Sequence, residues 1–74
     1  MIETNGFKYE IKIYWSKEDD CFISEVPELS GCKSDGKTYS DALQNAEIII
    51  AEWIETAKLL GRTIPEPKGK LINV

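Results

Sequence analysis

The sequence predicts a single α+β domain in which one long helix packs on one face of a small antiparallel sheet. Residues 7–15 alternate between apolar and polar, and residues 21–26 form a second apolar stretch after a polar connection. Residues 39–60 repeat apolar side chains at steps of three and four. A period of two is typical of a strand with one buried side, and steps of three and four are typical of an amphipathic helix.

The alternation in residues 7–15 predicts the first strand, because β-branched and aromatic residues occupy every second position. We expect the core side of this strand to carry Phe7, Tyr9, Ile11, Ile13 and Trp15. The opposite side then carries Lys8, Glu10, Lys12 and Tyr14.

Two further strands are expected before the helix. Residues 16–20 form a polar connection of hairpin length, so residues 21–26 should pair antiparallel with the first strand. Pro27 lacks the N–H that a ladder requires and should end this pairing. A loop and a short third strand over residues 32–34 follow, and Asp35-Gly36 supplies a turn before the helix.

The helix is expected over residues 39–60, because its ends carry recognisable caps. Thr38 is a good N-cap, with Asp41 three positions on in an approximate capping box, and Gly61 suits a left-handed C-cap. The apolar stripe predicted to pack on the first strand consists of Leu43, Ala46, Ile50, Trp53, Ala57 and Leu60. The whole of residues 1–74 is expected to be one domain, with residues 1–6 as a lead and residues 68–74 as an edge strand or tail.

Composition narrows the classes of function. The 74 residues carry a net charge of −4, which opposes direct binding to nucleic acid. Neither a signal peptide nor a membrane-spanning stretch is recognisable, so we expect a cytoplasmic protein in which Cys21 and Cys32 are free thiols. Without histidine or a C-x-x-C pair, no metal or other cofactor is expected. A core this small gains from association, which predicts at least a homodimer.

Catalysis is not expected, because no residues converge on a reactive centre. A metal-dependent nuclease needs several carboxylates gathered on adjacent strands. The candidates Glu10, Asp19, Asp20 and Glu25 are better explained as solvated surface charge. No histidine is available to activate a serine or cysteine nucleophile.

Several short motifs occur in a characteristic order. They are VPELSGC at residues 26–32, DGKT at residues 35–38, DALQNA at residues 41–46 and IPEP at residues 64–67. In this order and spacing the chain resembles the HicB antitoxin family over about residues 8–67.

The resemblance implies a β-β-β-α-β fold that is a partial ribonuclease-H-like unit. It also implies that the protein binds and occludes a small basic toxin, HicA, which is a messenger-RNA interferase. Many members add a C-terminal DNA-binding segment, and we expect this chain to be a short form that lacks it. Two alternatives remain open: a degenerate ribonuclease-H-like nuclease or nucleic-acid binder, and a stand-alone oligomeric scaffold without a toxin.

The helix offers one candidate partner-binding surface. Spacings of four, three and four residues place Ile48, Glu52, Glu55 and Leu59 on one ridge almost opposite the core stripe. A mixed apolar and acidic ridge suits a basic partner or a second copy of the chain. The alternative is that these are ordinary scattered surface residues.

The outer side of the sheet is the competing candidate. It is expected to carry Tyr14 and Ile23 among charged residues, a mixture that suits an interface. An exposed strand edge there could also pair with a partner strand.

Overall fold

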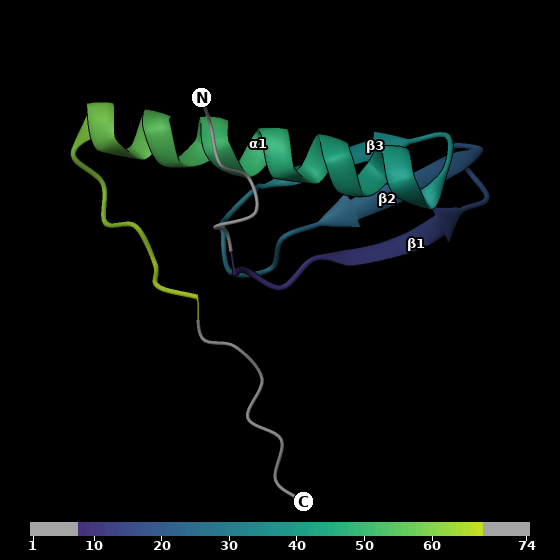
Figure 1. The fold of residues 1–74 in the computed structure, drawn as a ribbon, viewed down its shortest axis with the longest axis horizontal. Helices are drawn as coiled ribbons and strands as arrows, with labels where there is room; N and C mark the ends of the chain where they lie inside the picture. The colour runs from purple at the N-terminus through teal and green to yellow at the C-terminus, as the bar shows by residue number, and fades with distance from the viewer. Residues whose placement is uncertain (1–7, 68–74) are drawn as a thin grey trace, which may run out of the picture.

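A computed structural model describes residues 8–67 of the chain and shows three strands followed by one helix (Figure 1). The elements are β1 (Lys12–Ser16), β2 (Cys21–Glu25), β3 (Lys33–Gly36) and α1 (Tyr39–Leu60). The strands form an antiparallel sheet in the order β1-β2-β3, and α1 lies on one face of it. The predicted α+β class is therefore confirmed. The expected fourth strand lies outside the described residues, so the ribonuclease-H-like arrangement stays a prediction.

β1 is shorter than the alternation of residues 7–15 predicted. It begins at Lys12, which lies opposite Glu25 at the end of β2. Pro27 follows soon after and cannot donate to a ladder, so the segment over residues 8–11 has no strand to pair with. The turn expected at Asp35-Gly36 is also wrong, because both residues belong to β3.

The predicted bounds of α1 and its two caps are confirmed. Thr38 is extended, and its Oγ1 accepts a hydrogen bond of 3.0 Å from the N–H of Asp41. Gly61 has a φ of +70°, the left-handed conformation that glycine adopts without steric cost. The N–H of Arg62 then donates to the carbonyl of Ala57 at 2.8 Å. Caps of this kind satisfy backbone groups that the helix itself leaves unpaired.

α1 packs chiefly on β3 and β2, and contacts β1 least (Figure 1). Small residues allow this close approach. Ala42 is fully buried, as is Ser24 of β2. A Cβ added to Gly36 would lie 2.4 Å from the backbone nitrogen of Ala42, well inside contact distance. Glycine is therefore required where β3 meets the first turns of the helix.

The expectation that the helical stripe packs on the first strand is wrong. Leu43 and Leu60 were assigned to the core but are 43% and 61% exposed, and Trp15 is 49% exposed. The physical reason is that α1 lies above β3 and β2, so the helix-side face of β1 is left largely uncovered.

The core is built around a loop rather than around β1. Its buried cluster consists of Val26, Leu29, Cys32 and Ile50. Partly buried side chains pack around this cluster: Tyr9, Ile11, Ile49, Trp53 and Ile54. Three of the four buried residues thus come from residues 26–32, between β2 and β3.

The loop over residues 26–32 satisfies its backbone polar groups internally. The N–H of Val26 donates to the carbonyl of Cys32, the N–H of Leu29 to that of Val26, and the N–H of Cys32 to that of Leu29, each at 3.0 Å. Gly31 has a φ of +73° and allows the chain to turn back into β3. The three residues whose N–H groups donate are the buried residues of this loop, and they require such pairing because an unpaired buried amide is costly.

Candidate partner-binding surfaces

The predicted ridge on α1 is exposed along its whole length. We call it the helix-back surface and define it as Ile48, Glu52, Glu55 and Leu59. Ile48 is 49% exposed and Leu59 is 83% exposed. The buried residues of α1 (Ala42, Ala46, Ile50 and Ala57) lie on the other side of the helix. Two carboxylates between two exposed aliphatic side chains form a surface suited to a basic partner with an apolar component.

The outer sheet face, on the side away from α1, holds a connected polar group. The hydroxyl of Tyr14 donates to Oε2 of Glu25, and Nζ of Lys33 lies 3.9 Å from the same oxygen. The hydrogen bond to Glu25 is the main cause that raises the pKa of the Tyr14 phenol, so the phenol stays protonated and continues to donate. Ile23 lies opposite Tyr14 in the ladder and is only partly exposed.

The structure separates the two candidate surfaces that the sequence suggested. Tyr14 and Ile23 lie on the sheet face that points away from α1, whereas the helix-back surface lies on the far side of α1 from the sheet. A small partner contacting one of them would therefore not reach the other. They are alternatives rather than parts of one site.

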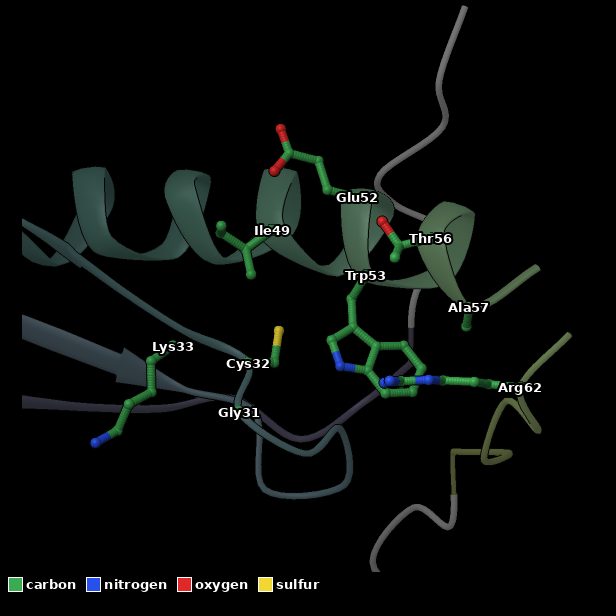
Figure 2. Close-up of a pocket in the computed structure, with 9 residues that line it drawn as sticks. All are labelled: Gly31, Cys32, Lys33, Ile49, Glu52, Trp53, Thr56, Ala57 and Arg62. Atoms are coloured by element: carbon green, nitrogen blue, oxygen red, sulfur yellow. The ribbon is translucent and has the colours of Figure 1, made fainter. Parts of the chain in front are cut away.

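A groove that the sequence did not indicate runs between α1 and the end of the buried loop (Figure 2). It has a volume of about 280 Å³ and is open to solvent. Its lining residues are Gly31, Cys32, Lys33, Ile49, Glu52, Trp53, Thr56, Ala57 and Arg62. Glu52 belongs to both this groove and the helix-back surface, so the two are continuous. Only the tertiary contact between α1 and the loop creates the groove, and no local sequence signal marks it.

Trp53 forms the wall of the groove and fixes its shape. Its indole Nε1 donates a hydrogen bond of 2.9 Å to the carbonyl of Ser30, which ties the helix to the loop. Figure 2 shows the indole extending from α1 toward the loop, while the carboxylate of Glu52 points outward from the helix. The groove thus has an aromatic wall, and its charged lining residues are Lys33, Glu52 and Arg62.

The described side chains offer little reactive chemistry. Burial raises the pKa of the Cys32 thiol, and desolvation followed by nearby aspartates raises that of Cys21. Both thiols are therefore held protonated and poorly nucleophilic at neutral pH. Over residues 8–67, no three histidine, cysteine or acidic side chains gather as a metal site.

Two of the acidic residues weighed as nuclease candidates accept hydrogen bonds from different side chains. Asp19 accepts a hydrogen bond of 3.0 Å from the hydroxyl of Ser16, and Glu25 accepts from Tyr14. The backbone N–H of Glu10 donates to a carboxylate oxygen of Glu28 at 3.3 Å. In the part of the chain that the structure describes, no helix combines the length and the apolar character needed to cross a bilayer.

The fold and these surfaces define the class: a small α+β domain whose candidate functional features are exposed surfaces and an open groove. A family model described as the HicB_like antitoxin of bacterial toxin–antitoxin systems matches residues 9–72. The chain therefore belongs to this antitoxin family, as its motifs indicated, and the family indicates a non-enzymatic role.

Curated relatives agree with the family model. The UPF0150 protein ssl0259 of Synechocystis sp. is 30% identical over 66 residues, which is 89% of each chain. The UPF0150 protein Ta0767 of Thermoplasma acidophilum is 36% identical over 67 residues, covering 90% of this chain and 96% of the relative. A comparison with solved structures gave no significant match.

Proposed function

We propose that the protein is the antitoxin of a toxin–antitoxin pair and binds a small basic HicA-type messenger-RNA interferase, covering its active site. The observation that carries the proposal is the family match over residues 9–72, which includes α1 and the core loop. The pair would meet in the cytoplasm, where such a toxin finds its substrate. The chain acts by occlusion and needs no catalytic residue, metal or cofactor of its own.

Charge supports a basic partner. The chain has a net charge of −4, and opposite charge steers two proteins together and raises their association rate. An occluding inhibitor also competes with RNA for a basic surface, so carboxylates at the interface imitate the phosphates that they replace.

We propose the helix-back surface as the toxin-binding site. Glu52 and Glu55 are exposed there, flanked by the apolar side chains of Ile48 and Leu59. The adjoining groove would add Trp53 as an aromatic anchor, the type of residue that dominates binding energy at interfaces. The outer sheet face with Tyr14 and Ile23 is the second candidate, favoured by its exposed aromatic ring.

The test begins with the neighbouring gene. A basic reading frame of about 60–90 residues beside this one is expected, and its expression should arrest growth unless this chain is also expressed. The double variant E52K/E55K should then bind the purified toxin at least about tenfold more weakly, since juxtaposed like charges at an interface cost several kcal/mol.

A matched control separates the site from the overall charge. The variant E18K/E66K makes the same change in net charge at two exposed residues away from the helix-back surface, and it should bind more tightly than E52K/E55K. Equal weakening by the two variants would show that the helix-back surface is not the specific toxin-binding site. If Tyr14→Ala loses binding while E52K/E55K retains it, the toxin-binding site is the outer sheet face.

Two other functions remain as alternatives, and each has its own test. RNA cleavage that needs a divalent metal and is abolished by Glu25→Gln would support a degenerate nuclease. Absence of any toxin gene, together with a stable homo-oligomer, would support a stand-alone scaffold. The expected homodimer is itself a proposal, because neither the family description nor the relatives' names state an oligomeric state.

A further inference from the structure

The groove beside Trp53 adjoins main-chain groups of β3 that no strand pairs with in the part of the chain described, residues 8–67. β3 is the last strand in the order β1-β2-β3. We propose that an extended segment of the basic partner pairs with β3 at Lys33 and directs an apolar side chain into the groove. This inference rests on the proposed toxin as the partner and adds how that partner is held.

Hydrogen bonds between β2 and β3 fix the directions of the main-chain groups of β3. The N–H of Val26 donates to the carbonyl of Cys32, so these facing residues form a hydrogen-bonded pair. Such pairs alternate with non-hydrogen-bonded pairs along an antiparallel ladder. The facing pairs that involve Lys33 and Asp35 are therefore non-hydrogen-bonded. It follows that the N–H and C=O groups of Lys33 and Asp35 point away from β2.

Contacts with α1 restrict the accessible part of β3 to its start. The side-chain amide of Asn45 donates to the carbonyl of Asp35 at 2.7 Å, so a side chain and not a strand occupies this carbonyl. At the end of β3, a Cβ added to Gly36 would lie 2.4 Å from the backbone nitrogen of Ala42, which leaves no room for a further strand under the helix. The remaining groups are the N–H and C=O of Lys33 and the N–H of Asp35, and we call them the β3 edge.

The groove lies between the β3 edge and α1 (Figure 2). The side chain of Lys33 extends away from α1, and its Nζ lies 3.9 Å from Oε2 of Glu25. The residue of an added strand that lies opposite Lys33 would share this outer face, and its neighbour would point to the α1 side. That neighbouring side chain enters the groove, where Ile49 and Trp53 supply apolar surface.

The size of the groove selects a segment of a protein as the occupant. The groove has a volume of about 280 Å³ and is open to solvent. Sites for small molecules are clefts or cavities of about 300–1,000 Å³ that enclose most of the ligand. A strand gains its affinity from main-chain hydrogen bonds and needs only a shallow pocket for a single side chain.

The charged lining residues select a basic side chain on that segment. Glu52 lines the groove and continues into the helix-back surface, where Glu55 adds a second carboxylate. The charge of Lys33 lies beside Glu25 on the outer sheet face. Arg62 follows the end of α1 and opposes a second basic side chain at that end of the groove. One basic side chain beside Glu52 therefore gives the best electrostatic match.

The ends of the described chain are held near the start of β1. The hydroxyl of Tyr9, three residues before β1, donates to the carbonyl of Pro65. The segment that follows α1 therefore runs toward β1, which lies at the opposite edge of the sheet from β3. This arrangement directs a partner strand to the β3 edge.

Two substitutions at Lys33 separate the role of its main chain from that of its side chain. Lys33→Pro removes the N–H that would donate to the partner, and should weaken binding to the purified toxin at least about tenfold in isothermal titration calorimetry. Proline is tolerated in an edge strand where the N–H faces outward, so the fold should be retained, which urea denaturation checks. Lys33→Ala removes the same charge but keeps the N–H, so it should bind at least as tightly as the natural chain.

Thr56→Phe tests the groove without changing β3. Thr56 is an exposed lining residue, so a ring at this position should fill the groove and weaken toxin binding at least about tenfold. Ser40→Phe is the matched control, because Ser40 is an exposed hydroxyl residue in the first turn of α1 and does not line the groove. It should leave the dissociation constant unchanged. This pair of variants keeps the test decisive if Lys33→Pro does not fold.

Hydrogen exchange followed by NMR measures the main-chain pairing directly. The amides of Lys33 and Asp35 should exchange rapidly in the free chain and at least about tenfold more slowly in the toxin complex. Ser34 lies opposite Ser24 of β2 in a hydrogen-bonded pair, so its amide should be protected in both states and serves as the internal control.

The outcomes separate this inference from the proposed function. A natural chain that binds no toxin would reject the proposed function, and the strand pairing with it. A chain that binds the toxin but keeps its affinity in folded Lys33→Pro or in Thr56→Phe would overturn the strand pairing alone. Protection of the Lys33 and Asp35 amides in the free chain would also overturn it, because another part of the chain or a second copy would already occupy the β3 edge.

Discussion

The two edges of the sheet meet the same helix in different ways. At β3, Gly36 allows α1 to approach until no additional Cβ fits, and Ala42 on the facing side of the helix is fully buried. At β1, the corresponding face carries Trp15, which remains half exposed. The comparison teaches that one amphipathic helix cannot cover three strands, and that side-chain size decides which strands it covers.

The largest difference in unfolding free energy is expected between alanine substitutions at two aliphatic residues of α1. Ile50 is fully buried above the core loop, so Ile50→Ala should cost about 3 kcal/mol of unfolding free energy through lost burial and a residual cavity. Leu43 is 43% exposed on the β1 side, and Leu43→Ala should cost less than about 1 kcal/mol. Urea denaturation at a concentration where the chain is monomeric measures both, and equal costs would refute the uneven coverage.

A second contrast concerns two glycines. Gly36→Ala should destabilise the fold by about 2 kcal/mol, because the new Cβ meets the helix backbone and forces α1 away from β3. Gly31→Ala meets no atom within 4 Å, and its cost of about 1 kcal/mol should come only from the left-handed φ of +73°. Thermal unfolding of the two variants separates steric contact from backbone strain. A harmless Gly36→Ala would mean that α1 does not approach β3 this closely.

A smaller change in unfolding free energy, of opposite sign, is expected at Ser24 of β2, which lies under α1. The hydroxyl of Ser24 is buried and finds no partner among the described residues. Ser24→Ala should therefore stabilise the protein by about 1 kcal/mol, since it removes an unsatisfied polar group. Ser34→Ala, at the facing position of β3 but partly exposed, should change the unfolding free energy by less than about 0.5 kcal/mol. Destabilisation by Ser24→Ala would show that the hydroxyl is bonded after all.

The smallest effect is the response to alkaline pH. Burial raises the pKa of Cys32 above its ordinary 9.0 and that of Tyr9 above its ordinary 10.0. The unfolded chain therefore loses these protons first, so the stability present below pH 9.0 should decline as pH rises through and beyond 10.0.

The hydroxyl of Tyr9, which donates to the carbonyl of Pro65, supplies a control for this decline. Tyr9→Phe cannot ionise, so its unfolding free energy should fall less steeply over the same pH range. Urea midpoints below and above this range measure the difference. A midpoint that rises with pH would contradict the assignment.

Sequence reasoning was most successful where short-range chemistry decides the structure. Thr38 and Gly61 mark the ends of α1 because capping depends only on residues within one turn. The four residues of the helix-back surface were predicted together because a helix fixes which side chains share a face. Their role as a binding site remains a prediction, since exposure alone does not identify a partner.

The periodicity of the sequence could not show which strands α1 covers; the tertiary structure decided this. Alternation showed that Trp15 lies on the helix-side face of its strand, yet it could not show that α1 would settle over β3 instead. That choice depends on the small residues Gly36, Ala42 and Ser24, which belong to three different elements and meet only in the fold.

The amino-acid sequence by itself therefore determined the order and type of the elements, the bounds and caps of α1, and the family of this protein. The folded chain alone decided that residues 26–32 form the centre of the core, that a groove opens beside Trp53, and that Trp15 of β1 stays half exposed. The reason is that local structure follows from neighbouring residues, whereas coverage follows from how closely distant backbones can approach.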